Sequence, residues 1–297
     1  MGEPTVVEGS PATLPLMLKA ALPAIPGVNL VPGVRKHGDA LPDLALTRHD
    51  VAVDPAHVAA YSEVCGFRVT GMLPVTYPHL LAFGLHMAVM TDGAFPFPAI
   101  GTVHLENRIT QHRPIAASER LQVTVHPEAL RAHPKGRAFD MVTRVHSAGE
   151  PVWEETSTFL RRGGGDRDAA PSALDALEQP APGPVTWNLP GDLGRRYASV
   201  SGDHNPIHLY GVTAKAFGFP RQIAHGMWSK ARSLAALEGR LPDALNVEVA
   251  FRKPILLPGR VGFGSARTAD GHAFALNRPK DDAPHLVGRV RAPSDNG

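Results

Sequence analysis

The same pattern occurs twice along the chain, and this internal repeat limits the possible folds more than any other feature. In the second half, residues 224–239 have a helical pattern that places Met227, Ala231 and Leu234 on one side. In the first half, residues 78–93 also have a helical pattern, and it is apolar nearly all round, which is typical of a buried central helix. Segments with strand patterns follow each helix. Each half is therefore predicted to form a loop, one long helix and a set of antiparallel strands.

Alternation of apolar and other side chains marks the strands. The predicted strands lie at residues 121–126, 138–146 and 151–160 in the first half, and at 247–251, from 261, 272–277 and 285–291 in the second. The segment Arg113-Pro114-Ile115 of the first half matches Lys253-Pro254-Ile255 of the second. A helix followed by antiparallel strands indicates the α+β class, in which the sheet covers the helix. Two such units can join within one chain as a pseudo-dimer.

A segment rich in glycine and proline separates the halves. Residues 161–185 contain three consecutive glycines and four prolines, so only the middle of the segment could hold one helical turn. We therefore expect a first repeat over residues 1–162, a linker over 163–185 and a second repeat over 186–297. The first repeat begins with about 30 residues that are rich in proline and apolar side chains, and no element is predicted for them.

Composition gives no indication of a nucleic-acid or membrane partner. The 30 basic and 28 acidic residues give a net charge of +2, and like charges do not form long runs. No apolar run approaches the roughly 18 residues of a membrane helix, and no secretory leader is recognised. The one cysteine, Cys65, excludes an intrachain disulfide and fits a reducing compartment. We expect a cytoplasmic protein.

Two titratable groups lie five residues apart in the segment SVSGDHNPIH, residues 199–208. A regular helix or strand would point Asp203 and His208 apart. Pro206 removes a backbone donor and pushes Asn205 toward extended geometry, so the pattern predicts an irregular turn. Such a turn lets the carboxylate and the imidazole meet at one water molecule as a general acid/base pair. Further along, Gly226 precedes a predicted helix, where a free backbone N–H could hold an oxyanion.

These segments carry a family resemblance. YASVSGDHNPIH, residues 197–208, and IAHGM, residues 223–227, resemble the signature of MaoC-type, or hydratase-2, enzymes. The resemblance implies a double hot-dog fold, in which each repeat wraps an antiparallel sheet around a long helix. It also implies a hydro-lyase that interconverts trans-2-enoyl and (R)-3-hydroxyacyl thioesters of CoA or acyl-carrier protein, with no cofactor or metal. Asp203 and His208 then match the catalytic pair, and Gly226 matches the donor to the thioester oxygen. The supporting residues are Asn205, Ser201 and Gly202.

The first half lacks this chemistry. Aligning CGFRVTGM, residues 65–72, with SGDHNPIH puts Phe67 at the Asp203 position and Met72 at the His208 position. Neither side chain transfers protons, so we expect one active site per chain. The first repeat should shape the acyl pocket and complete the dimer-like interface. Chains of this kind could also pair as homodimers.

Four alternatives remain open at this stage. Asp203, His204, His208 and His225 could bind a metal ion, although no HExxH pattern or second cysteine accompanies them. The same fold could instead carry a thioesterase, or a protein that binds thioesters without turnover. Basic side chains could meet the phosphates of the substrate, or simply face solvent; they are Arg221, Lys230, Arg252, Lys253 and Arg260. Three histidines of the first half are expected to be structural: His79, His86 and His104.

Overall fold

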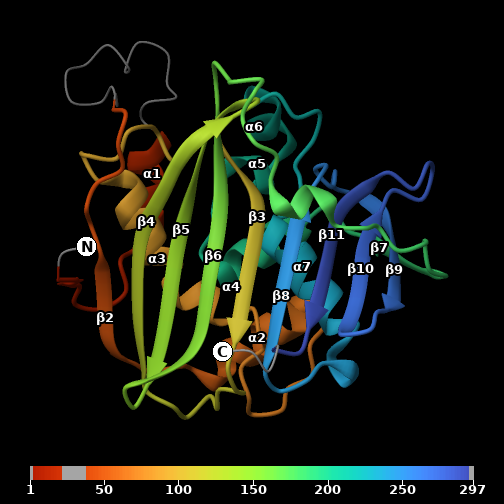
Figure 1. The fold of residues 1–297 in the computed structure, drawn as a ribbon, viewed down its shortest axis with the longest axis horizontal. Coiled ribbons are helices and arrows are strands. Elements are labelled where there is room, and N and C mark those ends of the chain that lie inside the picture. The colour runs from red at the N-terminus through yellow and green to blue at the C-terminus, as the bar shows by residue number, and fades with distance from the viewer. Residues whose placement is uncertain (1–2, 22–37, 294–297) are drawn as a thin grey trace.

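The computed structural model describes residues 3–21 and 38–293 and contains one continuous sheet. The strands of the first half are β1 (Thr5–Val6), β2 (Leu46–Val51), β3 (Thr102–Gln111), β4 (Leu121–His133), β5 (Gly136–Ser147) and β6 (Glu150–Arg162). The strands of the second half are β7 (Val185–Leu189), β8 (Leu245–Phe251), β9 (Gly259–Arg267), β10 (Gly271–Asn277) and β11 (Pro284–Arg291). Their order across the sheet is β1-β2-β4-β5-β6-β3-β8-β11-β10-β9-β7 (Figure 1). All neighbours are antiparallel except β1 and β2.

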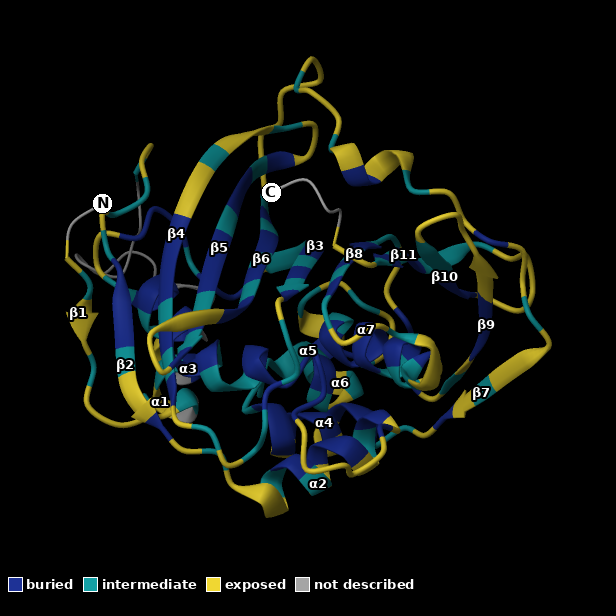
Figure 2. Cartoon of the chain, turned by 60° about the horizontal axis from the view of Figure 1, so that its bottom comes forward, coloured by how far each residue is buried: buried dark blue, intermediate teal, exposed yellow. Residues whose placement is uncertain are grey.

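The helices lie mainly on one face of this sheet (Figure 1). Those of the first half are α1 (Thr13–Ala21), α2 (Pro55–Cys65) and α3 (Pro78–Thr91). Those of the second half are α4 (Leu193–Ser201), α5 (Pro206–Leu209), α6 (Gly211–Ala216) and α7 (Gly226–Ala235), with short 3₁₀ helices η3 (Ala173–Ala176) and η4 (Glu238–Arg240). Figure 2 shows that α3 and much of α7 are buried beneath the sheet. The predicted α+β double hot-dog fold is confirmed.

The two predicted helices, α3 and α7, and the predicted strands lie where the sequence placed them. The predicted helical turn in the linker is η3. The segment before each long helix was predicted as a loop, and this is wrong. α2 precedes α3, and α4 precedes α7, because each buries one face: Tyr61 of α2 and Tyr197 of α4 are both buried, with ring centroids 6.2 Å apart. None of the helices in the described part of the chain is long and apolar enough to cross a membrane.

The repeats join at the pairing of β3 with β8. Arg108 lies directly opposite Glu248, and the register is symmetric about this pair. Glu248 follows Arg108 by the same number of residues as Pro254 follows Pro114, so Arg108 and Glu248 are corresponding residues of the two repeats. Because these corresponding residues face each other, they lie on the axis that relates the repeats. In a true homodimer, a residue on this axis would face its own copy. The two-repeat chain instead places opposite charges there, with Arg108 Nε 3.4 Å from Glu248 Oε1.

Candidate active site

A cavity of about 700 Å³ runs between the repeats, and the three predicted site residues Asp203, His208 and Gly226 all line it. The first repeat contributes side chains of α3 and β3 to the wall. The second contributes the end of α4, the α5 turn, the start of α7 and the end of β8. The catalytic candidates therefore share one chamber with a large part of the first repeat.

Asp203 is held by the turn that ends α4. Gly202 adopts the left-handed conformation, with φ of 74°, which glycine tolerates without strain. The Asp203 N–H then donates to Ser201 Oγ at 3.2 Å, and Asp203 Oδ1 accepts the Asn205 N–H at 3.1 Å. Ser201, Gly202 and Asn205 thus fix the direction of the carboxylate. The Asp203 side chain remains 25% exposed.

His208 lies on one turn of helix and not in the irregular turn that the sequence predicted. Pro206 begins α5 instead of preventing it, because the first residue of a helix needs no N–H donor. Asn205 caps this turn through its side chain, which accepts the Ile207 N–H at 3.4 Å. His208 Nδ1 lies 2.8 Å from the carbonyl oxygen of Ile223, to which only a protonated Nδ1 can donate. A neutral His208 therefore presents the lone pair of Nε2 to the cavity.

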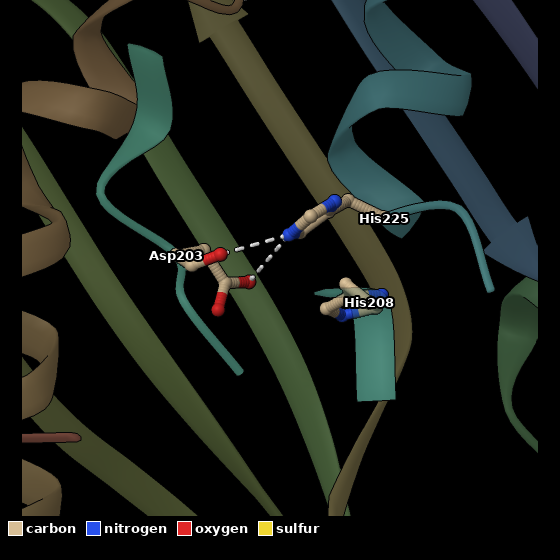
Figure 3. A group of neighbouring side chains, drawn as sticks. All are labelled: Asp203, His208 and His225. Atoms are coloured by element: carbon tan, nitrogen blue, oxygen red, sulfur yellow. Dashed lines mark hydrogen bonds and ion pairs between the residues drawn. The ribbon is translucent and has the colours of Figure 1, made fainter. Parts of the chain in front are cut away.

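His225 completes the group (Figure 3). Its Nε2 donates to the backbone oxygen of Asp203 at 3.0 Å and lies 3.7 Å from the Asp203 carboxylate. Its ring stacks on that of His208, with centroids 3.7 Å apart. The sequence placed His225 only among possible metal ligands and missed its packing role. Its position beside Gly226, directly before the helix, was the available signal.

The surroundings favour an ionised carboxylate beside neutral imidazoles. Burial lowers the pKa of His208 and lowers that of His225 to about 3. Burial alone would raise the pKa of Asp203, but the two imidazoles and the Asn205 N–H outweigh it and leave this pKa below its usual value. At neutral pH, Asp203 is then a hydrogen-bond acceptor and His208 Nε2 is a free base.

Gly226 is the first residue of α7, where backbone N–H groups have no intrahelical acceptor and the helix dipole favours negative charge. A Cβ at this position would lie 3.2 Å from Cε1 of Phe251, which is tighter than ordinary contact. Glycine therefore leaves room for the Phe251 ring beside the start of α7. The arrangement suits an oxygen that gains charge beside the Asp203 and His208 pair.

The metal alternative was built on four residues, and three of them meet. Ligand atoms of Asp203, His208 and His225 lie within 4.8 Å of one another, whereas His204 bonds to the Gly202 carbonyl with its Nδ1. His208 Nδ1 and His225 Nε2 both face carbonyl oxygens and carry protons, so the lone pairs lie on His208 Nε2 and His225 Nδ1. With the Asp203 carboxylate these are three donors, one fewer than the four of a closed structural zinc site.

The first repeat keeps only the start of this arrangement. Gly66 ends α2 in the left-handed conformation, as Gly202 ends α4, and Phe67 then follows as Asp203 does. Met72 does not match His208, contrary to the sequence alignment. It forms a single bridge to Ala116, as Ile223 does to Leu256, so Met72 corresponds to Ile223. Between α2 and α3, where every residue is described, the first repeat has no counterpart of α5 and α6, the two helices inserted in the second repeat that include His208.

The basic residues do not form one phosphate site. Lys230 was expected to be able to meet phosphates, and this is wrong: its side chain is fully buried and donates to Asn107 Oδ1. Arg252 is paired with Asp175 and bonds to the Leu174 carbonyl. Lys253 does line the cavity, together with Lys135 and Arg162 of the first repeat.

Close packing between α4 and α5 gives a first test of the geometry. A Cβ on Gly194 would lie only 1.9 Å from the carbonyl oxygen of His208, so Gly194→Ala must push the α5 turn away. We expect the site's activity to fall by about tenfold, since small displacements of reacting groups slow catalysis strongly. Gly239→Ala is the matched control, because no atom lies within 4 Å of its Cβ. Equal activity and equal thermal stability of both variants would contradict the packing described.

Comparisons with known proteins show the family and the fold. A family model described as a MaoC like domain matches residues 175–275. The 3-hydroxyacyl-thioester dehydratase X of Mycobacterium tuberculosis is 40% identical over 283 residues, which are 95% of this chain and 98% of the relative. A crystal structure of HtdX from Mycobacterium tuberculosis matches with a TM-score of 0.75 and 39% identity, covering 84% of this chain and all (100%) of that one. A MaoC-like dehydratase from Phytophthora capsici has a TM-score of 0.69 at 19% identity, covering 86% and 97% of the two chains, and shows the fold alone.

Proposed function

The chain belongs to the MaoC-like dehydratase family, and from this premise we propose that it interconverts trans-2-enoyl thioesters and (R)-3-hydroxyacyl thioesters. The observation that carries the proposal is the meeting of Asp203, His208 Nε2 and the start of α7 in one cavity. The activity of the relative supports the same reaction class. The reaction adds or removes one water molecule and needs no electron acceptor.

The proposed mechanism starts from one water molecule between the two groups. The Asp203 carboxylate and His208 Nε2 each accept one of its O–H bonds, which turns a lone pair of the water oxygen toward C3 of the enoyl thioester. As that oxygen bonds to C3, His208 takes one water proton. The resulting imidazolium returns the proton to C2 on the same face, and the Asp203 carboxylate stabilises it meanwhile. Dehydration runs through the same steps in reverse.

Gly226 supplies the third part of the mechanism. While the oxygen adds to C3, electrons move from the C2–C3 double bond toward the thioester carbonyl, whose oxygen gains negative charge. The Gly226 N–H, at the positive end of the α7 dipole, donates to that oxygen. Protonation of C2 restores the carbonyl.

We assign the acyl pocket largely to the first repeat. Apolar side chains of this repeat line the cavity, namely Phe83, Met87, Met90, Ala99, Ile100 and Phe159. The two repeats expected from the sequence then have different roles: residues 1–162 shape the acyl pocket, and residues 186–297 contain the catalytic residues. Lys135, Arg162 and Lys253 are then the cations for phosphates of CoA or of a carrier protein's pantetheine. Pairing of two chains as a homodimer is a separate proposal, which light scattering would test.

The pKa values predict how activity depends on pH. Hydration needs an unprotonated His208 Nε2, and burial lowers the pKa of His208 below 6.5. We therefore expect the acid limb of kcat/KM, where His208 gains a proton, to have its midpoint below 6.5. A pH profile of enoyl-CoA hydration measures this acid limb. An acid limb with its midpoint above 6.5 would contradict the tautomer and burial assigned to His208.

The function is tested by following two readouts with one set of enoyl-CoA thioesters. A hydratase removes the conjugated double bond and releases no thiol, whereas a thioesterase releases free CoA. We expect loss of enoyl absorbance without thiol release. Thiol release would favour the thioesterase alternative, and binding without either signal would favour a scaffold protein.

A further inference from the structure

Three histidines of the first repeat line the same cavity as the catalytic pair: His79, His86 and His104. We call them the polar cluster. His79 and His86 lie on α3, and His104 lies on β3. Met87 and Met90 of α3 line the same cavity. From the sequence alone, these histidines were expected to be structural. Their place in the wall of a substrate cavity indicates more.

The polar cluster lies beside the catalytic loop. The His79 ring is 6.3 Å from that of Phe83, and a Cβ on Gly202 would lie 3.8 Å from Cδ1 of Phe83. On the other side, the His104 ring is 4.9 Å from that of Phe251, which contacts Gly226. An acyl group that leaves the reacting carbons toward the first repeat therefore meets these imidazoles.

His79 is oriented by a buried carboxylate. Its Nδ1 donates to Glu155, at 2.8 Å from Oε2 and 3.0 Å from Oε1. Burial would raise the pKa of Glu155, but His79 and Asn107 lower it to about 2, so the carboxylate is ionised. Asn107 Nδ2 also donates to Glu155 at 2.6 Å, and Asn107 Oδ1 accepts from the buried ammonium of Lys230. This network fixes the imidazole ring and leaves its Nε2 for the cavity.

The other two histidines each have an unsatisfied ring nitrogen. His86 Nε2 bonds to Thr143 Oγ1 at 2.8 Å, but its Nδ1 is buried without a hydrogen-bond partner among the described residues. The same holds for Nε2 of His104, whose ring stacks on Phe159. Neither nitrogen is accessible to water in this structure, so each bears the cost of an unpaired buried polar group, and an acyl-chain oxygen that reaches it would remove that cost.

We propose that the polar cluster is a second polar subsite, which binds an oxygen carried by the acyl group beyond the reacting C2 and C3. The substrate class is then a 2-enoyl or 3-hydroxyacyl thioester with a further hydroxyl or oxo group in its chain. A hydroxyl fits best, because it can both donate to and accept from an imidazole. This inference rests on the proposed function. Glu155 acts through His79 and is a positioning residue.

The test compares matched trans-2-enoyl-CoA thioesters of equal length, one set with plain chains and one with a hydroxyl moved carbon by carbon along the chain. For the wild type we expect kcat/KM to be at least about tenfold higher for the best hydroxylated member than for its plain partner, since sites built for a hydroxyl discriminate strongly against its absence. A third set, with an oxo group in place of the hydroxyl, shows whether the subsite donates or accepts the hydrogen bond, because an oxo group can only accept one. If no thioester of either set is hydrated, the proposed function fails; if both sets react equally, only the subsite fails.

Variants assign the preference to the polar cluster. His104→Phe keeps the aromatic stack with Phe159 and Phe251 and removes the ring nitrogens, and His79→Phe removes the oriented imidazole. The preference ratio is kcat/KM for the hydroxylated thioester divided by that for its plain partner. We expect this ratio to fall to about one in at least one of the two variants. Met87→Leu, an apolar change in the same wall, should keep the wild-type ratio. The His79→Phe variant leaves Glu155 without its partner and could fail to fold. In that case the His104→Phe variant and the wild-type preference for the hydroxylated thioester still test the subsite. A preference that both phenylalanine variants keep would overturn the assignment.

Discussion

Asp203→Asn is expected to lower kcat/KM for enoyl-thioester hydration by about 10²–10⁴, the usual contribution of a general acid/base group. Asparagine keeps the shape of the side chain, and its Oδ1 can still accept the Asn205 N–H that holds the turn. What it loses is the charge that orients the water and stabilises a protonated His208. The variant should therefore fold like the wild type and bind substrate with little change in affinity. Initial rates and a substrate titration measure the two effects.

A companion variant separates the two roles of His208. In His208→Asn, the amide N–H can replace the Nδ1–H that donates to Ile223, but no base replaces Nε2. We expect a loss as large as that of Asp203→Asn, and a double variant no worse than either single variant, because both groups act on one water. Asp192→Asn is the control, since Asp192 makes no capping bond and does not line the cavity. Wild-type rates in Asp203→Asn or His208→Asn would remove that residue from the mechanism.

Gly226→Pro should lower kcat by about 10²–10³ relative to Gly226→Ala, because only the proline removes the N–H donor. Proline suits the first position of a helix, and His225 already has the extended ψ of 140° that a following proline requires. Both variants place a Cβ 3.2 Å from Phe251, so the steric change at that contact is shared. Their ratio therefore isolates the hydrogen bond to the thioester oxygen.

If Gly226→Ala and Gly226→Pro lose activity equally, crowding against Phe251 explains the loss and the N–H is not an oxyanion donor. Circular dichroism and thermal melting of both variants show whether α7 is kept. Burst and steady-state rates then show whether the change lies in chemistry or in binding.

Several elements of the fold were predictable because their apolar residues follow a regular pattern. α7 follows the helical period, α3 is apolar nearly all round, and β8 alternates as its sequence does. Two of the missed helices, α5 and α6, are too short for such a pattern. α5 has only 4 residues and α6 only 6, so neither can show a period, and their positions depend on tertiary packing.

The site was predictable in its residue types but not in its protonation. The spacing of Asp203 and His208 excluded a regular element joining them, and the structure satisfies this with a glycine-ended helix followed by a separate helical turn. Which nitrogen of His208 faces the cavity depends on Ile223, which comes from another segment. The burial of Lys230 depends on Asn107 of the opposite repeat. Contacts between repeats of this kind leave no local pattern in the sequence.

We propose that the second repeat adds water to an enoyl thioester from one face. The most direct measurement is hydration of trans-2-enoyl-CoA by the purified chain, with chiral separation of the 3-hydroxyacyl product and Asp203→Asn run in parallel. We predict the (R)-3-hydroxyacyl thioester alone, formed by the wild type and at a rate lower by at least about 10² in the variant. Formation of the (S) product, or equal rates from both proteins, would contradict the account.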